Sequence, residues 1–408
     1  MCLKAHRKIE INTIPYLFHT PMSFSELTLS VTKGLSKAEK KQYGFFVTPP
    51  IIIRQMIDRI QRENPAIQSI LEPSCGTGEF ITACQTAFPG VPIDGVEWNP
   101  TVFEKTKKVF PDIHHADFTK WQKGGYDLII GNPPYFVCQK GDVPPAYREY
   151  MVGRPNMFGV FILHAIALLA PGGLLAFVIP KSFMNSAYYA KIREHVLRTC
   201  SILDITVFDQ AEFIDTEQET FGIFLQKGNI SLDSPFVIRM DNTWIMTENA
   251  ERLRALLEGS TTLKALGYSV KTGQVVWNEN KDRLTDDNTK PLLIYNSNVS
   301  ADHTFILKTF SNPEKKAFID LANAKTEPTI VVNRGNGNTA YSLTYAYIDG
   351  SQPYFVENHL NVIQKAANPD YPRILRSLQD PRTIEFLKLF IGNGGLSKTE
   401  LENFLPIY

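Results

Sequence analysis

The feature that most limits the fold of this chain is an alternation of short apolar runs with amphipathic stretches between residues 43 and 228. We expect strands at residues 69–71, 93–96, 126–130 and 174–179, and helices at residues 78–87, 100–109 and 158–169. Strands that alternate with helices at this spacing favour a parallel sheet covered by helices on both faces. The sequence therefore predicts an α/β domain that ends near Gly228.

The rest of the chain has a different texture. Residues 1–40 are weakly periodic, and we predict an N-terminal arm there, with a solvated helical turn at residues 36–41. Residues 41–230 hold the α/β domain. Beyond it, Asn-rich and Gly-rich segments such as 333–338 and 391–395 separate short mixed elements. We therefore predict a second domain over residues 231–408, whose fold the periodicity does not define.

Composition excludes several classes of protein. The chain has 42 Lys and Arg against 42 Asp and Glu, so any contact with a nucleic acid must come from local arrangement. No apolar run approaches the roughly 20 residues that span a bilayer, and residues 9–18 are too interrupted for a signal peptide. The 5 cysteines are scattered, with no Cys-x-x-Cys pair for zinc. We expect a cytoplasmic protein with no metal and no membrane association.

The loop at residues 71–80, Leu-Glu-Pro-Ser-Cys-Gly-Thr-Gly-Glu-Phe, follows an expected strand and opens a helix. Open α/β sheets bind their ligands at this place. The loop lacks the three-glycine dinucleotide fingerprint and the Lys-Ser or Lys-Thr of a phosphate loop, which disfavours NAD and ATP. A carboxylate beside a glycine turn suits a ligand with ammonium and sulfonium charges, such as S-adenosylmethionine. The predicted cofactor-binding residues of this loop are Glu72, Ser74, Cys75, Gly76 and Gly78.

Two further acidic residues follow expected strands. Glu97 ends the next strand, about 20 residues after the loop, where an acid typically accepts hydrogen bonds from a ribose diol. Asp117 and Phe118 end the short segment 114–116 and could supply an acceptor and an apolar wall for an adenine ring. We therefore include all three residues in the predicted cofactor site.

The tetrapeptide Asn132-Pro133-Pro134-Tyr135 directly follows the strand at residues 126–130. Adenine's amine is a poor nucleophile because its lone pair is delocalised into the ring, and two acceptors placed on its hydrogens would localise that pair. The Asn132 side chain and the Pro133 carbonyl can accept those hydrogens, and the stiff Pro133-Pro134 unit fixes their geometry. Tyr135 offers a face on which an extruded base can stack. The motif predicts amino methylation without a metal or a covalent intermediate, and Asn132 is also expected to border the cofactor.

With these motifs in this order, residues 43–228 resemble the gamma-class adenine-N6 DNA methyltransferases of the TaqI type, which are type II restriction-modification methylases. Residues 44–50 resemble the family segment whose threonine, here Thr48, touches the methionine moiety. Residues 156–161 and 170–180 are similar to the family's helix and strand after the catalytic loop. The resemblance implies a class I S-adenosylmethionine-dependent methyltransferase (Rossmann-like) domain over residues 41–230, with a seven-stranded sheet that includes one antiparallel strand.

The resemblance also implies a C-terminal α+β target-recognition domain over residues 231–408, in which segments 272–277 and 392–401 are similar to recurring segments of such domains. The family uses a second aromatic residue to hold the flipped base. The segment 219–227 offers Phe221 and Phe224, while the closest register places Leu225 there, and we favour Phe224. Candidates for DNA contact are Lys271, Lys281, Arg283, Lys315, Lys316 and Arg334, with the Arg334–Asn338 loop preferred because glycines allow close approach and asparagine can pair with adenine.

The expected activity is methyl transfer from S-adenosylmethionine to N6 of a flipped adenine in double-stranded DNA, with S-adenosylhomocysteine as product. We expect a monomer in the cytoplasm, or in the host cytoplasm for a phage or viral enzyme, with a separate cognate restriction endonuclease as a potential partner. RNA adenine methylation and protein glutamine methylation stay open, because the same tetrapeptide serves a conjugated amide. The intact motif argues against a purely DNA-binding subunit. Cytosine-ring methylation is excluded because none of the cysteines follows a proline.

Overall fold

The computed structural model describes residues 23–208, 219–228, 230, 234–241, 243–335, 341–364, 367–391 and 395–408. The first 22 residues of the predicted arm therefore lie outside the described part. None of the helices in the described ranges combines the length and the apolar character that a membrane span requires.

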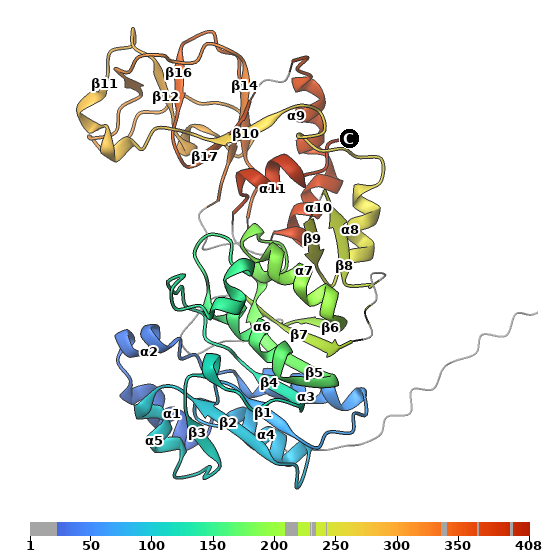
Figure 1. The fold of residues 1–408 in the computed structure, drawn as a ribbon. Helices are drawn as coiled ribbons and strands as arrows, with labels where there is room; N and C mark the ends of the chain where they lie inside the picture. Colours follow the sequence, from blue (N-terminus) through green and yellow to red (C-terminus); the bar gives the residue numbers. More distant parts are fainter. Residues whose placement is uncertain are drawn as a thin grey trace, which may run out of the picture. The chain divides into compact units, whose positions relative to one another are not determined.

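A seven-stranded sheet dominates the N-terminal half of the chain (Figure 1). Its strands are β1 (Ile70–Glu72), β2 (Ile93–Glu97), β3 (Ile113–His115), β4 (Tyr126–Gly131), β5 (Leu169–Pro180), β6 (Cys200–Val207) and β7 (Thr220–Lys227), in the order β3-β2-β1-β4-β5-β7-β6. The pairings from β3 through β5 are parallel, whereas β6 and β7 pair antiparallel. Among the described strands, one of these two therefore runs against all the others. This arrangement confirms the predicted class I methyltransferase fold.

The strand order places two loops of interest side by side. The chain leaves β1 toward β2 on one side and later returns to β4 on the other side of β1, with Leu71 opposite Ile129. Loops that follow such neighbouring parallel strands open at the same edge of the sheet, where α/β proteins bind ligands. The loops after β1 and β4 carry the two motifs singled out in the sequence.

Helices precede and separate these strands. They are α1 (Glu26–Gly34), α2 (Lys37–Tyr43), α3 (Pro50–Arg62), α4 (Glu79–Ala87), α5 (Pro100–Thr106), α6 (Met157–Leu168) and α7 (Ala190–Thr199). The helix α2 begins with a capping box between Ser36 and Glu39 and ends at the left-handed Gly44. The helix α3 starts with Pro50 and buries one apolar stripe that includes Ile53 and Met56.

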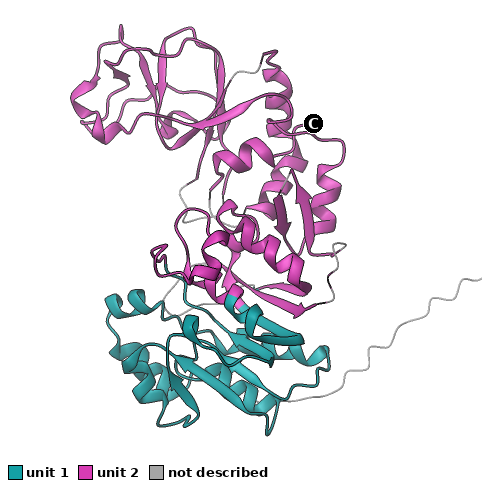
Figure 2. Cartoon of the chain, viewed as in Figure 1, with its two compact units in different colours: residues 1–136, 164–177, 208–217 teal, residues 137–163, 178–207, 218–408 magenta. Residues whose placement is uncertain are grey.

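The chain forms two compact units (Figure 2). Unit 1 comprises residues 1–136, 164–177 and 208–217, and unit 2 comprises residues 137–163, 178–207 and 218–408. The domain boundaries predicted from the sequence, after residues 40 and 230, stay a prediction. The two units are defined by spatial contacts, and each combines several separate segments of the chain.

The C-terminal part of unit 2 mixes small sheets with helices, as the predicted α+β class requires. Its strands are β8 (Val237–Met240), β9 (Thr243–Met246), β10 (Ser269–Thr272), β11 (Leu284–Thr285), β12 (Leu292–Ile294), β13 (Phe318–Ile319), β14 (Thr329–Asn333), β15 (Tyr345–Ile348), β16 (Tyr354–Val356) and β17 (Leu360–Gln364). They form the sheets β10-β17-β14-β15 and β11-β13-β12-β16 and the hairpin β8-β9. The helices are α8 (Ala250–Leu257), α9 (Tyr371–Gln379), α10 (Pro381–Phe390) and α11 (Lys398–Asn403). One core, which includes Leu253, Ile363 and Phe386, joins these helices to the first sheet and the hairpin.

Candidate active site

The loop between β1 and α4 depends on two glycines. Gly76 and Gly78 both have positive φ, 52° and 85°, which side chains disfavour. A Cβ atom on Gly78 would also lie 2.3 Å from the Phe110 ring. The amide of Cys75 donates to the Val96 carbonyl at 2.8 Å and so anchors the loop to β2. The predicted cofactor loop is therefore a fixed turn at the carboxyl end of β1.

Glu97, at the end of β2, holds the same loop. Its Oε2 accepts from the Gly76 amide at 2.8 Å, and its Oε1 accepts from the Asn99 amide at 2.6 Å. Burial raises the pKa of Glu97 to about 7, although these backbone donors oppose the shift. Glu97 therefore orients the glycine turn, and its predicted role toward a ribose stays a prediction.

Glu72 is the most unusual acid of the site. It is only 3% exposed, and its Oε2 has no hydrogen-bond partner. Burial, followed by the charges of Glu97 and Glu79, holds the pKa of Glu72 well above its ordinary range. No salt bridge reaches Glu72 from any described cation. A buried carboxylate in this state suits a cationic ligand.

Asn132, directly after β4, presents an unused acceptor. Its Nδ2 donates to the Phe46 carbonyl at 3.3 Å, whereas its Oδ1 is buried and has no partner. Because the amide NH2 can only donate, the bond to Phe46 fixes which end of the side chain carries the free oxygen. The backbone oxygen of Asn132 accepts from Ser74 Oγ at 3.0 Å, which ties the tetrapeptide to the cofactor loop.

The segment at residues 44–48 packs directly on the tetrapeptide. A Cβ atom on Gly44, whose φ is 60°, would lie 2.7 Å from Pro134 Cβ, so only glycine allows this approach. The rings of Phe46 and Tyr135 are nearly parallel, at 21°, with centroids 6.2 Å apart. Burial raises the pKa of Tyr135 well above its ordinary value, so its phenol stays neutral. Thr48 is buried, and its Oγ1 has no partner.

Three segments far apart in the sequence thus meet in unit 1, and each contributes a buried polar atom without a partner. The atoms are Thr48 Oγ1, Glu72 Oε2 and Asn132 Oδ1. Buried polar groups are nearly always hydrogen-bonded, so unused ones gathered at one place indicate a ligand site. The predicted residues Ser74, Cys75, Gly76, Pro133 and Pro134 lie in the same segments.

Asp117 and Phe118 have local partners as well. Asp117 Oδ1 accepts from the amide and the hydroxyl of Thr119, at 3.0 and 2.8 Å, which caps a short helical turn. Phe118 is buried, with its ring edge-on to His164 at 4.8 Å. The second carboxylate oxygen of the half-buried Asp117 lies 3.2 Å from the Lys120 ammonium. The proposed contact of this pair with an adenine ring stays a prediction.

The candidates for the second aromatic position lie on β7 in unit 2. Phe221, Phe224 and Leu225 are all buried, with exposures of 0%, 3% and 0%. Burial does not distinguish between them, and the preference for Phe224 stays a prediction.

Burial raises the pKa of the four described cysteine thiols, so none of these four is activated as a nucleophile. Burial and the Glu72 carboxylate raise the pKa of the Cys75 and Cys84 thiols, so both stay protonated. Within the described ranges no group of three His, Cys, Asp or Glu side chains is arranged to hold a metal ion.

The candidates for DNA contact divide into two groups in unit 2. Lys281 pairs with Glu314 at 2.7 Å, and Lys316 pairs with Asp286 at 2.6 Å. The ammonium of Lys315 lies over the rings of Trp277 and Tyr295, 4.7 and 4.9 Å from their centroids.

Lys271, Arg283 and Arg334 form no salt bridge with a described acid. Arg334 donates to the Asn358 carbonyl at 2.9 Å. Residues 336–338 of the preferred loop and residues 392–394 of the segment 392–401 lie outside the described residues.

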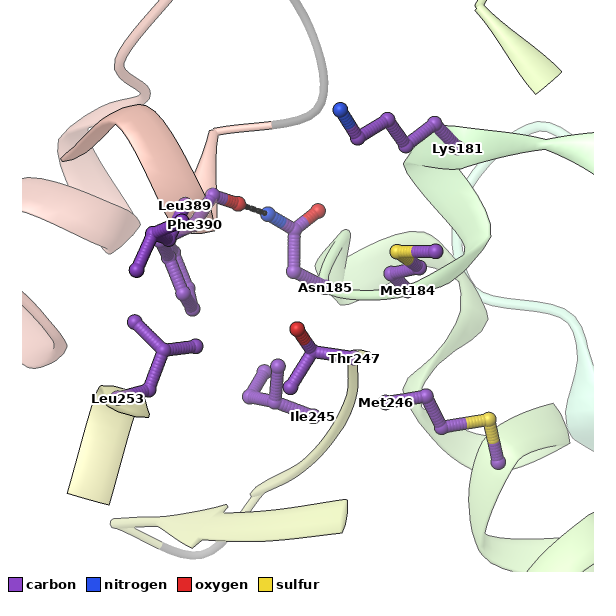
Figure 3. Close-up of a pocket in the computed structure, with 9 residues that line it drawn as sticks. All are labelled: Lys181, Met184, Asn185, Ile245, Met246, Thr247, Leu253, Leu389 and Phe390. Carbon is purple, nitrogen blue, oxygen red and sulfur yellow. Dashed lines mark hydrogen bonds between the residues drawn. The ribbon is translucent and has the colours of Figure 1, made fainter. Parts of the chain in front are cut away.

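A small pocket lies in unit 2 (Figure 3). The segment after β5 lines it together with β9, α8 and α10. In it, Asn185 donates to the Phe390 carbonyl, while Asn185 Oδ1 has no partner. Its lining is mostly apolar, and none of the predicted site residues belongs to it.

Sequence reasoning missed two parts of the site. The Phe46 carbonyl orients Asn132, but a backbone acceptor has no side-chain signature. Ser25 and Thr28 of the expected arm bond to Glu79 at the start of α4. Ser25 as a helix cap, with Val31 and Leu35 at helical spacing behind it, was the available signal for this helix.

Comparison with known proteins agrees with this geometry. Residues 93–214 match the family described as the Eco57I restriction-modification methylase. The chain is 28% identical to the type II methyltransferase M.CvrRI of Paramecium bursaria Chlorella virus XZ-6E over 395 residues, which cover 94% of this chain and 99% of the relative. It is also 28% identical to the modification methylase CviBIII of Paramecium bursaria Chlorella virus NC1A, with the same coverage.

A solved structure of the type IIG restriction endonuclease BpuSI aligns with 93% of this chain and 60% of its own, at 14% identity and a TM-score of 0.45. The sequence identity to the two viral methylases extends along nearly the whole length of this chain.

Proposed function

We propose that this protein transfers a methyl group from S-adenosylmethionine to the N6 amine of adenine in double-stranded DNA. The observation that carries the proposal is Asn132 Oδ1, a buried acceptor without a partner, oriented by the bond from Nδ2 to the Phe46 carbonyl. An exocyclic amine is the kind of donor that such an atom lacks. Adenine-N6 specificity and the TaqI-type assignment rest on the tetrapeptide around this atom.

The residues of unit 1 fit the cofactor. Glu72, with its elevated pKa and unpartnered Oε2, suits a cationic amino-acid portion, and Thr48 Oγ1 offers a further hydrogen bond. Glu97 would receive a ribose, and Asp117 with Phe118 would receive the adenine ring. When bound, S-adenosylmethionine supplies an electrophilic methyl group on a sulfonium, and S-adenosylhomocysteine is the product. The turn at Ser74, Cys75, Gly76 and Gly78 lets the ligand approach the backbone.

The chain's own residues would act mainly by positioning. Asn132 Oδ1 and the Pro133 carbonyl accept the two hydrogens of the amine, which localises the nitrogen lone pair and aims it. Pro134 and the packed Gly44 keep this loop rigid, since neither leaves the backbone free to shift. Tyr135, kept neutral by burial, offers its ring to a base turned out of the duplex, and Phe224 is our candidate for the second aromatic residue.

The relatives favour DNA as the substrate over the two alternatives. Their names describe type II and modification methylases, and their similarity covers the C-terminal α+β region as well as the catalytic motifs. Methyltransferases that act on a glutamine side chain or on RNA would not need that region to be shared with such relatives. We therefore assign residues 41–230 to catalysis and residues 231–408 to target recognition, in a cytoplasmic monomer. A separate endonuclease that cuts the same sequence would complete a restriction pair.

The test is single-molecule sequencing of DNA from cells that express the chain, which reports both the modified base and its sequence context. We expect N6-methyladenine at one short motif. Asn132→Ala should lower methyl transfer to duplex DNA by roughly a thousandfold, the loss typical of removing a positioned catalytic hydrogen-bonding group. It should leave the dissociation constant for S-adenosylmethionine within a few-fold of wild type.

A matched control is Asn280→Ala, which removes an asparagine side chain of unit 2 whose amide donates to the Val276 carbonyl and which lies outside the motifs. This variant should methylate DNA at the wild-type rate. Labelling of RNA or of a polypeptide, with every adenine of the duplexes unaltered, would overturn the proposed substrate.

A further inference from the structure

The start of α1 is bonded to the start of α4, immediately after the cofactor loop. The amide and the Oγ of Ser25 donate to Glu79 Oε1 at 3.0 and 2.8 Å. Thr28 Oγ1 donates to the same carboxylate oxygen. One oxygen of Glu79 therefore accepts three hydrogen bonds from Ser25 and Thr28, which lie 54 and 51 residues earlier in the chain.

These bonds fix the direction of the next one. Thr28 Oγ1 and Thr77 Oγ1 are 2.6 Å apart, and either hydroxyl could be the donor by distance alone. Because the hydrogen of Thr28 points to the Glu79 carboxylate, Thr77 must be the donor to Thr28. Thr77 lies between Gly76 and Gly78, the two loop residues with positive φ. A residue of the cofactor loop is thus held by a hydroxyl of α1.

The apolar side of α1 contacts a second part of the site. Val31 and Leu35 pack in one cluster with Phe45 and Val47, which flank the Phe46 carbonyl that orients Asn132. Val47 also precedes Thr48. The same short helix therefore contacts the cofactor loop through its hydroxyls and the segment 44–48 through its apolar stripe.

We propose that α1 is a brace that positions the cofactor loop, with Ser25 and Thr28 as positioning residues that act through Glu79 and Thr77. The inference rests on the proposed function only in taking S-adenosylmethionine as the ligand of the loop. The sequence predicted only an N-terminal arm at this position. The proposal instead makes the affinity for the cofactor depend on two residues that do not belong to the cofactor loop.

The physical reason is the flexibility of the loop without the brace. The glycines of the loop permit many backbone conformations, and the ligand binds to one of them. The apparent affinity is therefore reduced in proportion to the fraction of molecules whose loop has that conformation. Thr28 and Thr77 are both buried, at 0% and 4% exposure, so their hydroxyls have no water to replace a lost partner. Hydrogen bonds to a charged group in such surroundings are among the stronger ones in proteins.

The experiment compares two threonines of the same helix. Thr28→Val removes the bonded hydroxyl, whereas Thr32→Val removes a buried hydroxyl that has no partner. We expect Thr28→Val to raise the dissociation constant for S-adenosylhomocysteine about tenfold, measured by titration calorimetry without DNA. Thr32→Val should leave that constant unchanged. Thr28→Ser, which keeps the hydroxyl, should restore tight binding.

A purely structural role gives a different pattern. In that case Thr28→Val lowers the melting temperature of the unliganded protein. The folded variant nevertheless binds S-adenosylhomocysteine as tightly as the Thr32→Val control does. This result would refute the brace. Ser25→Ala, at the exposed rim of the network, provides a second variant with a smaller shift in the same direction should Thr28→Val fail to fold. Equal affinities in all four variants would also refute the brace.

Methylation assays separate the two proposals. The brace predicts a higher KM for S-adenosylmethionine with kcat at saturation retained, together with unchanged affinity for duplex DNA. If the wild-type protein binds the cofactor and Thr28→Val weakens that binding, the brace stands even when no adenine is methylated, and only the proposed substrate falls. A wild-type chain without affinity for the cofactor would remove both.

Discussion

At the residue scale, the buried carboxylate of Glu72 makes cofactor binding depend on pH. Burial and the charges of Glu97 and Glu79 raise the pKa of Glu72, so the unliganded site favours the protonated acid. A cationic ligand favours the ionised form, and binding must then release a proton. We expect the affinity for S-adenosylmethionine to rise with pH, by up to about tenfold per unit below that pKa.

Calorimetry between pH 6 and 8, in buffers of different ionisation enthalpy, measures this proton release. Glu72→Gln should bind more weakly and lose most of the dependence. Glu104→Gln, a change of an exposed glutamate in α5, should retain it. A steep dependence that persists in Glu72→Gln would assign the proton to Glu97, whose pKa of about 7 lies in the same range.

The same acids affect the stability of the unliganded protein. Glu97 has a folded-state pKa of about 7, above the ordinary value of 4.5, so the folded state binds more protons between these values. Its contribution to stability is therefore complete below about pH 4.5 and is lost as pH rises through 7. Because the affinity for the cofactor is expected to rise over the same pH range, the cofactor should raise the melting temperature more at pH 8 than at pH 6.

At the element scale, Arg193 of α7 joins parts of unit 2 that are distant in sequence. Its guanidinium is fully buried and donates to the carbonyls of Trp244 in β9, Phe183 and Ser186, at 2.7, 3.0 and 2.7 Å. Burial without a carboxylate lowers its pKa to about 9. We expect Arg193→Met to lower the free energy of unfolding by about 2–4 kcal/mol, because it leaves several buried carbonyls without a donor.

Urea denaturation checks this value against Arg198→Met. Arg198 lies on the same helix, is exposed, and pairs with Glu194 one turn away. Its replacement should cost little, as exposed ion pairs do. Similar losses in the two variants would show that the carbonyl contacts of Arg193 do not stabilise unit 2.

The elements also show what sequence can and cannot predict. The expected strands at β1, β2 and β4 and the helices at α4, α5 and α6 are confirmed, because their apolar periodicity is strong and local. The helix α1 was expected as an arm, because its buried Thr28 and Thr32 have the polarity of solvated residues. The hydroxyl of Thr28 is satisfied in the core by Thr77 and Glu79, which lie about 50 residues away.

The candidate site also has parts that the sequence could predict and parts that it could not. The loop glycines and the tetrapeptide could be placed from sequence because their spacing from strand ends is fixed by the fold. The free Oδ1 of Asn132 could not, since it depends on the Phe46 carbonyl. The strands β11 and β13 contain 2 residues each, and register over so short a length comes from long-range packing that no local pattern records.

At the scale of the whole molecule, 42 basic and 42 acidic side chains cancel, so long-range attraction to DNA must come from cations whose charge is not already neutralised. Lys281, Lys290 and Lys316 each lie within 3 Å of a carboxylate. Lys271 and Lys325 have no such partner among the described acids. Burial and the nearby charge of Lys271 lower the pKa of Lys325, and the charge of Glu327 opposes this shift.

We therefore expect Lys271 and Lys325 to contact DNA phosphates. Each phosphate contact releases condensed counterions, and losing one lowers the slope of log Kd against log salt concentration by about one. Lys271→Gln and Lys325→Gln should each produce that decrease for duplexes of any sequence, measured by fluorescence anisotropy between 50 and 200 mM salt. Lys316→Gln is the matched control, because its ammonium would first have to leave Asp286 to reach a phosphate. A larger change of slope in the control than in the other two variants would mean that the paired lysines exchange their carboxylates for phosphates, and that pairing in the unbound chain does not identify its DNA-binding surface.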